Sequence, residues 1–147
     1  MEKKIVKSAG GLVFRDNKGK LEVLLGGGSK KEADYWGFPK GRQKAGELIE
    51  MTALREIREE TGIQTELLAL LGRSEYTLTN KNRKQHKFAY YYLARAIGGN
   101  LKDKDDELQY VRWVSLTKAA TLLTYDADRE LLIKATKMTK KWYREML

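Results

Sequence analysis

The chain has 147 residues, the length of a single domain, and 41% hydrophobic and 33% charged residues are typical of a folded globular protein. A domain of this size can fold without disulfides, and the absence of cysteine excludes thiol catalysis and Cys-ligated metal sites. No apolar run approaches the roughly 20 residues that cross a bilayer, so we expect no membrane association and a cytoplasmic location. The net charge of +9 favours an anionic partner.

The first part of the chain predicts two strands and a long loop. Residues 4–14 have the composition of a strand, which we expect to be interrupted by the Gly10–Gly11 pair. A short buried strand over residues 21–28 ends in glycines. Residues 30–46 are polar, apart from a Trp-Gly-Phe-Pro insert, and predict a loop.

The remainder of the chain mixes helices and strands. A helix is predicted over residues 48–61, with Gly62 as the residue that ends it. Further elements are predicted in the following ranges: strands at 65–79, 86–97 and 109–114, a short helix at 116–123, and an amphipathic helix from a cap at Asp126 or Asp128 to residue 147. This order predicts a mixed α/β sandwich and not a regular βαβ array such as a Rossmann fold.

The predicted helix at residues 48–61 carries three carboxylates on one face. Glu56, Glu59 and Glu60 fall within an arc of roughly 100° on a helical wheel, because neighbours at i, i+3 and i+4 share a face. Arg55 and Arg58 point to other sides of the wheel, so we expect that they cannot neutralise all three. Mg²⁺ prefers carboxylate oxygens and fills its remaining positions with water and phosphate. The face is therefore interpreted as a metal platform.

The same carboxylates belong to a longer pattern over residues 41–63, GRQKAGELIEMTALREIREETGI. Seven fixed residues and two aliphatic ones match the Nudix box, a coincidence of the order of one in 10⁹ per window at average residue usage. The chain therefore resembles a Nudix hydrolase along nearly its whole length. The resemblance implies one domain over residues 1–147, folded as an α/β/α sandwich with a mixed β-sheet, which hydrolyses nucleoside diphosphates linked to another moiety with Mg²⁺, or Mn²⁺ in its place.

The resemblance also assigns roles to residues of the box. Glu59 and Glu60 are expected to bind the metal, and Glu56 is expected to be a further ligand or the base that deprotonates water. The backbone carbonyl of Lys40 would complete the metal shell. Glu47 and Arg55 would pair and hold the loop against the helix. Outside the box, Glu107 is the candidate for a fourth carboxylate, although turn formation before a strand explains it equally well.

The segments that flank the box resemble the asymmetric diadenosine tetraphosphate hydrolases. Residues 36–42, 87–94 and 107–114 are similar to the W-G-x-P-K-G-H/K, K-x-x-x-Y-W-L-A and E-x-Q-x-Y-R-W-L segments of that subgroup. Two departures matter here, because Arg42 replaces a histidine or lysine and Tyr92 replaces a tryptophan. Both replacements keep a cation or an aromatic ring.

This resemblance predicts a substrate with a long phosphate chain between two purines. Cations would lie along the phosphates and aromatic rings would stack on a base, which contributes about 1–3 kcal/mol per base. The candidate substrate-binding residues are Trp36, Lys40, Arg42, Tyr76, Lys87, Tyr91 and Tyr125. For any one tyrosine, core packing is the simpler explanation.

Four functions remain open from the sequence. The leading one is hydrolysis of diadenosine tetraphosphate to ATP and AMP by a monomer or homodimer. Alternatives are removal of pyrophosphate from the 5′ end of RNA, which the positive charge would suit, and hydrolysis of oxidised nucleotides such as 8-oxo-dGTP. A regulator that binds nucleotides without hydrolysis is the non-enzymatic alternative, although such domains usually lose box carboxylates and this chain keeps all of them.

Overall fold

A computed structural model describes residues 2–146 of the chain. The elements are, in chain order, β1 (Glu2–Asn17), β2 (Lys20–Ser29), β3 (Trp36–Gly37), β4 (Lys40–Arg42), α1 (Ile49–Thr61), β5 (Ile63–Asn80), β6 (Arg83–Gly99), the 3₁₀ turn η1 (Leu101–Asp103), β7 (Leu108–Ser115), α2 (Leu116–Leu122) and α3 (Asp126–Met146). Within this part of the chain, no helix combines the length and hydrophobicity that are needed to cross a membrane.

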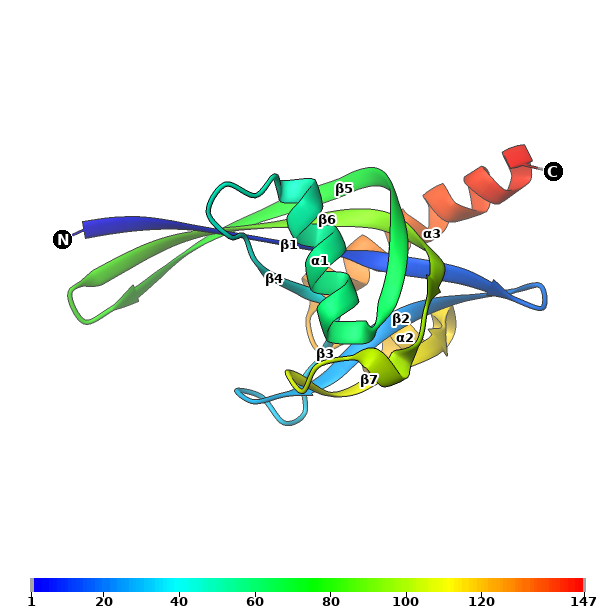
Figure 1. Ribbon diagram of the computed structural model, residues 1–147, viewed down its shortest axis with the longest axis horizontal. Coiled ribbons are helices and arrows are strands. Elements are labelled where there is room, and N and C mark those ends of the chain that lie inside the picture. The colour runs from blue at the N-terminus through cyan, green and yellow to red at the C-terminus, as the bar shows by residue number, and fades with distance from the viewer. Residues whose placement is uncertain (1, 147) are drawn as a thin grey trace.

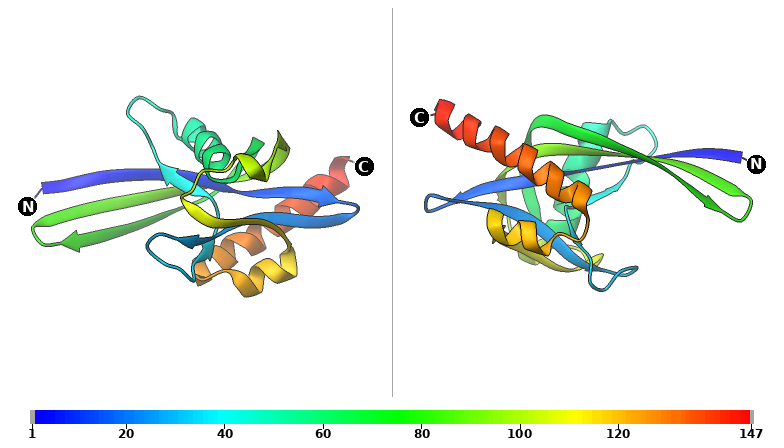
Figure 2. Two further views of the ribbon diagram at one scale, coloured as in Figure 1. Left: turned by 60° about the horizontal axis from the view of Figure 1, so that its bottom comes forward. Right: turned by 180° about the vertical axis from the view of Figure 1, so that it is seen from behind.

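The strands form one mixed sheet in the order β3-β2-β1-β6-β5, with β4 paired to β1 and β7 paired to β2. The long central strand β1 runs parallel to β6 and antiparallel to β2 and β4. Helix α1 covers one face of the sheet, and α2 and α3 cover the other (Figures 1 and 2). The predicted α/β/α sandwich with a mixed sheet is therefore confirmed.

Each face of the sheet has its own hydrophobic core. On the side of α2 and α3, Leu12 and Phe14 of β1 pack with Leu132 and Ala135 of α3. On the opposite side, Ile57 of α1 packs against a separate cluster from β1, β2 and β6. Helix α1 is thus fixed to the sheet through its apolar face, and its acidic residues are held in a defined position.

The C-terminal end of α1 is set by Gly62, as predicted. This residue adopts the left-handed conformation with φ 78°, and its N–H donates to the Arg58 carbonyl at 2.8 Å. A Cβ atom at Gly62 would overlap the carbonyl oxygen of Asn100, so both the conformation and the space require glycine.

Three predictions about the elements are wrong. Strand β1 continues through the Gly10–Gly11 pair, because the glycines admit a close neighbour instead of a break: a Cβ at Gly10 would overlap the Pro39 carbonyl. The predicted loop over residues 30–46 contains the short strands β3 and β4. Helix α3 begins at Asp126 itself, so that residue is not a cap outside the helix.

The hairpin of β5 and β6 extends away from the body of the molecule, and the beginning of β1 runs beside it (Figure 1). The register pairs Lys4 with Gln85 on β6 and continues without interruption to Phe14 and Arg95. The N-terminal half of β1 is therefore part of a three-stranded extension that leaves the sandwich next to β4.

Candidate metal centre and substrate face

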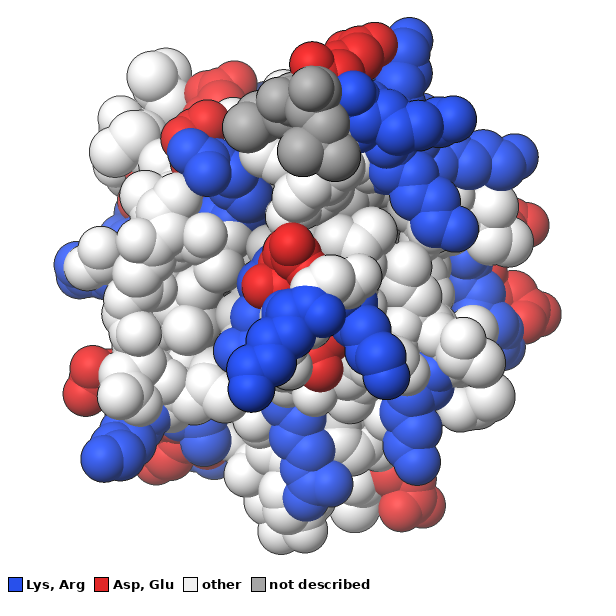
Figure 3. All heavy atoms as spheres, turned by 90° about the vertical axis from the view of Figure 1, so that its right-hand side faces the viewer, with Lys and Arg blue, Asp and Glu red and all other residues white. Residues whose placement is uncertain are grey.

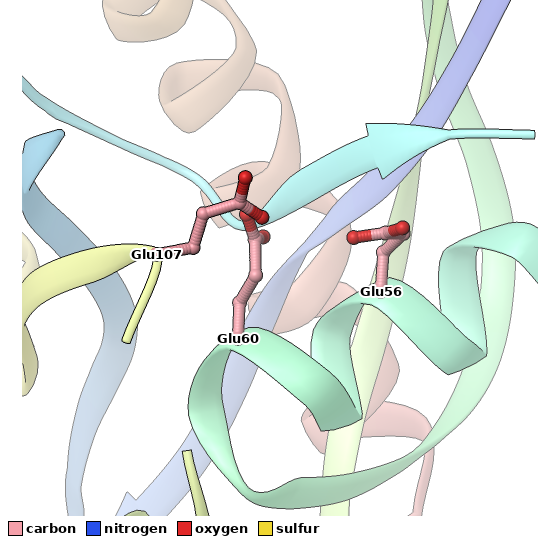
Figure 4. Close-up of side chains that lie close together, drawn as sticks. All are labelled: Glu56, Glu60 and Glu107. Carbon is pink, nitrogen blue, oxygen red and sulfur yellow. The ribbon is translucent and has the colours of Figure 1, made fainter. Parts of the chain in front are cut away.

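Three carboxylates converge beside the last two turns of α1. Glu56, Glu60 and Glu107 each offer an oxygen atom, and these atoms all lie within 4.8 Å of one another. Glu56 and Glu60 are one turn apart on α1, and Glu107 reaches them from the segment just before β7 (Figure 4). The candidate fourth carboxylate thus lies with two members of the box.

The cluster is electrostatically unsatisfied. Glu60 is only 6% exposed, and its Oε2 atom is buried without a hydrogen-bond partner among the described residues. Burial and the nearby Glu56 and Glu107 raise the pKa of Glu60 to about 9, against a smaller opposing effect of a hydrogen bond from the Lys40 backbone. Burial also raises the pKa of Glu56. Crowded carboxylates with an orphaned oxygen fit a hard divalent cation such as Mg²⁺.

Gly41 keeps the space that the cluster needs. A Cβ atom at this position would overlap the carboxylate of Glu56. Because Lys40 and Gly41 lie in β4, which pairs with β1, the backbone of the box loop is fixed against the carboxylates of α1. This contact explains why the first position of the box requires glycine.

A second acidic cluster surrounds Arg55. Its Nε donates to Glu47 Oε2 at 2.7 Å, and its Nη1 donates to Glu56 Oε1 at 2.7 Å and Glu59 Oε2 at 3.1 Å. The predicted pair between Glu47 and Arg55 is therefore present. Although the helical wheel points Arg55 to another side, its long side chain reaches Glu56 and Glu59, so two of the three carboxylates on the acidic face are paired and, as predicted, not all three. Glu60 is the one it does not reach.

Glu59 lies in this second cluster and outside the group of Glu56, Glu60 and Glu107. Its side chain is 41% exposed and held by Arg55 from the preceding turn. The carboxylate would have to leave Arg55 to join a metal ion at the first cluster. Its predicted role as a ligand stays a prediction.

The cations predicted to contact phosphate gather around β4. Lys40 and Arg42 are two residues apart on this strand, and therefore extend to the same face. Burial, together with the positive charges of Arg42, Lys31 and Lys40, lowers the pKa of Lys87 on β6. Lys40, Arg42 and Lys87 thus form one positive strip, and Lys40 and Arg42 leave the face of β4 opposite to the one on which Gly41 borders Glu56.

The aromatic residues divide into buried and exposed ones. Tyr91 is 7% exposed and packs in the core on the α3 side, with Lys40 Nζ 5.6 Å from its ring centre. This burial argues against Tyr91 as a free wall of a base clamp. Tyr76 and Tyr125 are 45% and 47% exposed, so their rings remain available. Trp36 stacks on Tyr110 with ring centres 6.2 Å apart, which is a packing role.

Sequence reasoning missed two polar residues on this face. Asp128, in the first turn of α3, is buried, and burial raises its pKa against the attraction of Lys40. Burial and the nearby Asp128 also raise the pKa of Tyr35. The sequence did contain a signal for the burial of Asp128. The residue has helical spacing to the buried Leu132, Ala135 and Thr139 and therefore lies on the apolar face of α3.

Comparison with known proteins agrees with this architecture. Residues 5–135 match the model of the NUDIX domain. The chain therefore belongs to the NUDIX domain family, whose members act on phosphoanhydrides. The box at residues 41–63 is the segment that supplies α1 and most of the two acidic clusters.

Particular relatives point to more than one substrate class. The asymmetrical bis(5′-nucleosyl)-tetraphosphatase of Caenorhabditis elegans is 31% identical over 134 residues, which are 88% of this chain and 94% of that protein. The crystal structure of a C. elegans Ap4A hydrolase binary complex superimposes with a TM-score of 0.72 at 28% identity, covering 92% of this chain and 98% of that one. An 8-oxo-(d)GTP phosphatase of Mycolicibacterium smegmatis is 29% identical over 92% of this chain. The chain spans about half the length of the mycobacterial relatives it matches.

Proposed function

We propose that the protein is a metal-dependent hydrolase that cleaves a phosphoanhydride bond in a nucleoside diphosphate derivative, with diadenosine tetraphosphate, cut to ATP and AMP, as its main substrate. The observation that carries the proposal is the convergence of Glu56, Glu60 and Glu107 on one point, with a buried and unpartnered oxygen on Glu60. Lys40 and Arg42 of the positive strip flank Gly41, which borders the Glu56 carboxylate.

The carboxylates of the site would hold the metal ion. Glu56 and Glu60, with Glu107 and the Lys40 carbonyl, would hold Mg²⁺ or Mn²⁺, and Glu59 would add a ligand after release from Arg55. When bound, the metal supplies charge neutralisation at the phosphoryl oxygens and acidifies a water molecule.

Water attacks phosphorus, the P–O bond of the anhydride breaks, and the proton of the water passes to a carboxylate. Glu56 is our candidate for this carboxylate, because it lies in the cluster and burial raises its pKa.

The preference for a dinucleotide rests on residues outside the box. Lys40 and Arg42 would neutralise the phosphate chain, and Lys87 would contact it from β6. Tyr76 and Tyr125 would provide exposed rings for a base, whereas Tyr91 is buried and Trp36 stacks on Tyr110. The similarity to asymmetrical tetraphosphatases over most of both chains supports the same choice.

The experiment is a substrate panel in the presence of Mg²⁺. Diadenosine tetraphosphate, triphosphorylated RNA, 8-oxo-dGTP, ADP-ribose and an inositol pyrophosphate are compared by kcat/KM under the same conditions. We expect the dinucleotide to have the highest value and ATP and AMP to appear in equal amounts. A higher value for RNA or 8-oxo-dGTP would overturn the substrate assignment, and no turnover of any of them would overturn the enzymatic function.

Hydrolysis of 8-oxo-dGTP is the second candidate, because a relative with that activity in its name matches 92% of this chain. In that case the shorter phosphate chain would use Lys40 and leave the outer cations without a role. The panel separates the two candidates directly.

A further inference from the structure

A groove lies between the start of β1 and the loop that joins β4 to α1. Its volume is about 410 Å³, and residues 4–7 form one wall while residues 42–47 form the other. The antiparallel pairing of β4 with β1 ends here, and the N–H of Gln43 donates to the Lys7 carbonyl at 2.9 Å at the boundary. The groove thus begins where the box loop turns away from the sheet.

The groove is strongly positive. Four of its lining side chains are cationic and exposed, namely Lys4, Lys7, Arg42 and Lys44. The one acidic lining residue is Glu47, whose carboxylate accepts hydrogen bonds from Arg55, Thr52 and the Lys44 N–H. These hydrogen bonds lower the pKa of Glu47 to about 2, so it stays ionised and paired with Arg55. The lysines of the groove therefore have no acidic partner within it.

The groove shares one residue with the positive strip. Arg42 lines the groove and also belongs to the strip with Lys40 and Lys87. From Lys40 to Lys44 the chain advances four residues, which corresponds to at most about 13 Å of extended backbone.

Positive charge alone does not single out this groove. Lysine and arginine side chains are also spread over the end of the molecule that carries the C-terminus (Figure 3). The groove differs because it combines a hollow, four cations and continuity with Arg42. Those three properties together indicate a site for an elongated anion.

We propose that this groove is a second anion subsite, which holds the distal phosphates of a substrate whose phosphate chain is longer than a diphosphate. The inference rests on the proposed function, because it assigns the groove to the same substrate. Lys4 and Lys44 are the side chains that would contact the distal phosphates. A two-phosphate substrate such as ADP-ribose would not extend that far.

The test replaces Lys4 and Lys44 together by alanine. The matched control replaces Lys118 and Lys137, two exposed lysines on α2 and α3, so that both variants lose the same charge. Binding of tripolyphosphate is measured by titration calorimetry in EDTA, and kcat and KM are measured with Mg²⁺ for diadenosine tetraphosphate and ADP-ribose.

We expect the groove variant to weaken tripolyphosphate binding and to raise KM for the tetraphosphate by at least fivefold, with kcat unchanged. KM for ADP-ribose, and all values of the control variant, should stay within twofold of the unsubstituted protein. Unchanged tripolyphosphate binding, or an equal rise of KM for both substrates, would overturn the subsite.

The two proposals can fail separately. If the unsubstituted protein does not cleave the tetraphosphate but the groove variant still loses tripolyphosphate binding, the substrate assignment is wrong and the anion subsite stands. If the tetraphosphate is cleaved and the groove variant behaves like the control, the subsite is wrong and the catalytic proposal stands.

Discussion

Two acidic clusters lie side by side at α1, and they differ in whether a cation pairs with their carboxylates. Around Arg55, the carboxylates of Glu47 and Glu59 are both paired with one guanidinium. Around Glu60, the carboxylates face one another, and Arg55 reaches only Glu56. The box thus contains carboxylates that stabilise the loop and carboxylates that are left for a cation, and the difference follows from the reach of one arginine.

Glu56 belongs to both clusters. One of its oxygens accepts a hydrogen bond from Arg55, and the residue also lies within the group of Glu60 and Glu107. The paired cluster therefore fixes the orientation of the unpaired one. Substitutions that separate the two clusters test this interpretation.

The largest expected effect comes from removing the charge of Glu60. We predict that Glu60→Gln lowers kcat/KM for the preferred substrate by at least about 100-fold, because metal-held charge stabilisation would be lost. Glu66→Gln is the control, since that carboxylate is exposed and paired with Arg95 on the far part of the sheet. Turnover of Glu60→Gln at the level of the control would refute the metal assignment.

Removing Arg55 should break the paired cluster. Arg55→Met leaves Glu47, Glu56 and Glu59 without their common partner, and the Arg55 side chain is only 19% exposed. We predict a loss of about 2 kcal/mol in the free energy of unfolding, measured by urea denaturation. This loss is smaller than that for breaking a fully buried ion pair, because the site is partly solvated. Arg73→Gln, in an exposed pair with Glu75, should cost less than about 0.5 kcal/mol. Equal losses in both variants would contradict the stabilising role of Arg55.

A smaller effect is expected at Gly41. Gly41→Ala places a Cβ against the carboxylate of Glu56, which must move away from the cluster. We predict a drop in kcat/KM of about tenfold, or about 1.4 kcal/mol, and a matching loss of Mg²⁺ affinity. Gly72→Ala meets only Leu131 at 3.7 Å and should leave activity unchanged. Full activity of Gly41→Ala would show that the position of Glu56 is not critical.

The smallest effect concerns stability and pH in EDTA. The pKa of Glu60 is raised to about 9 in the folded protein and is about 4.3 in the unfolded chain. Between these two pH values, Glu60 is protonated in the folded protein and ionised in the unfolded chain. The contribution of Glu60 to the free energy of unfolding is therefore fully present below about pH 4 and is lost as the pH rises toward 9. Between pH 5 and 9, the free energy of unfolding should fall less in Glu60→Gln than in the unsubstituted protein. The difference between the two falls should be about 1 kcal/mol or more. If the free energies of unfolding of the two proteins changed in parallel with pH, the raised pKa of Glu60 would be contradicted.

The sequence predicted the fold and α1 well, for definite physical reasons. The helix has a strong apolar period at Ala53 and Ile57, and Gly62 ends it through a conformation that other residues rarely adopt. The continuity of β1 through Gly10 and Gly11 was not predictable, because it depends on the approach of Pro39 from another segment.

The site was predictable only in part, since side-chain reach and long-range contacts are invisible in a local pattern. A helical wheel gives the direction of Arg55 but not the length of its side chain, which extends to Glu56 and Glu59. Glu107 could be suggested from the sequence, yet its contact with α1 depends on the path of the chain before β7. The groove beside residues 42–47 required the fold, because its other wall is the start of β1.

The most direct test of the metal centre is a crystal structure of the protein soaked with Mn²⁺ and measured at a wavelength with strong manganese anomalous scattering. We predict an anomalous peak between Glu56, Glu60 and Glu107, at a bonding distance of about 2.0–2.4 Å from at least two of their carboxylate oxygens. A well-ordered peak elsewhere, with these three carboxylates free of metal, would contradict the account.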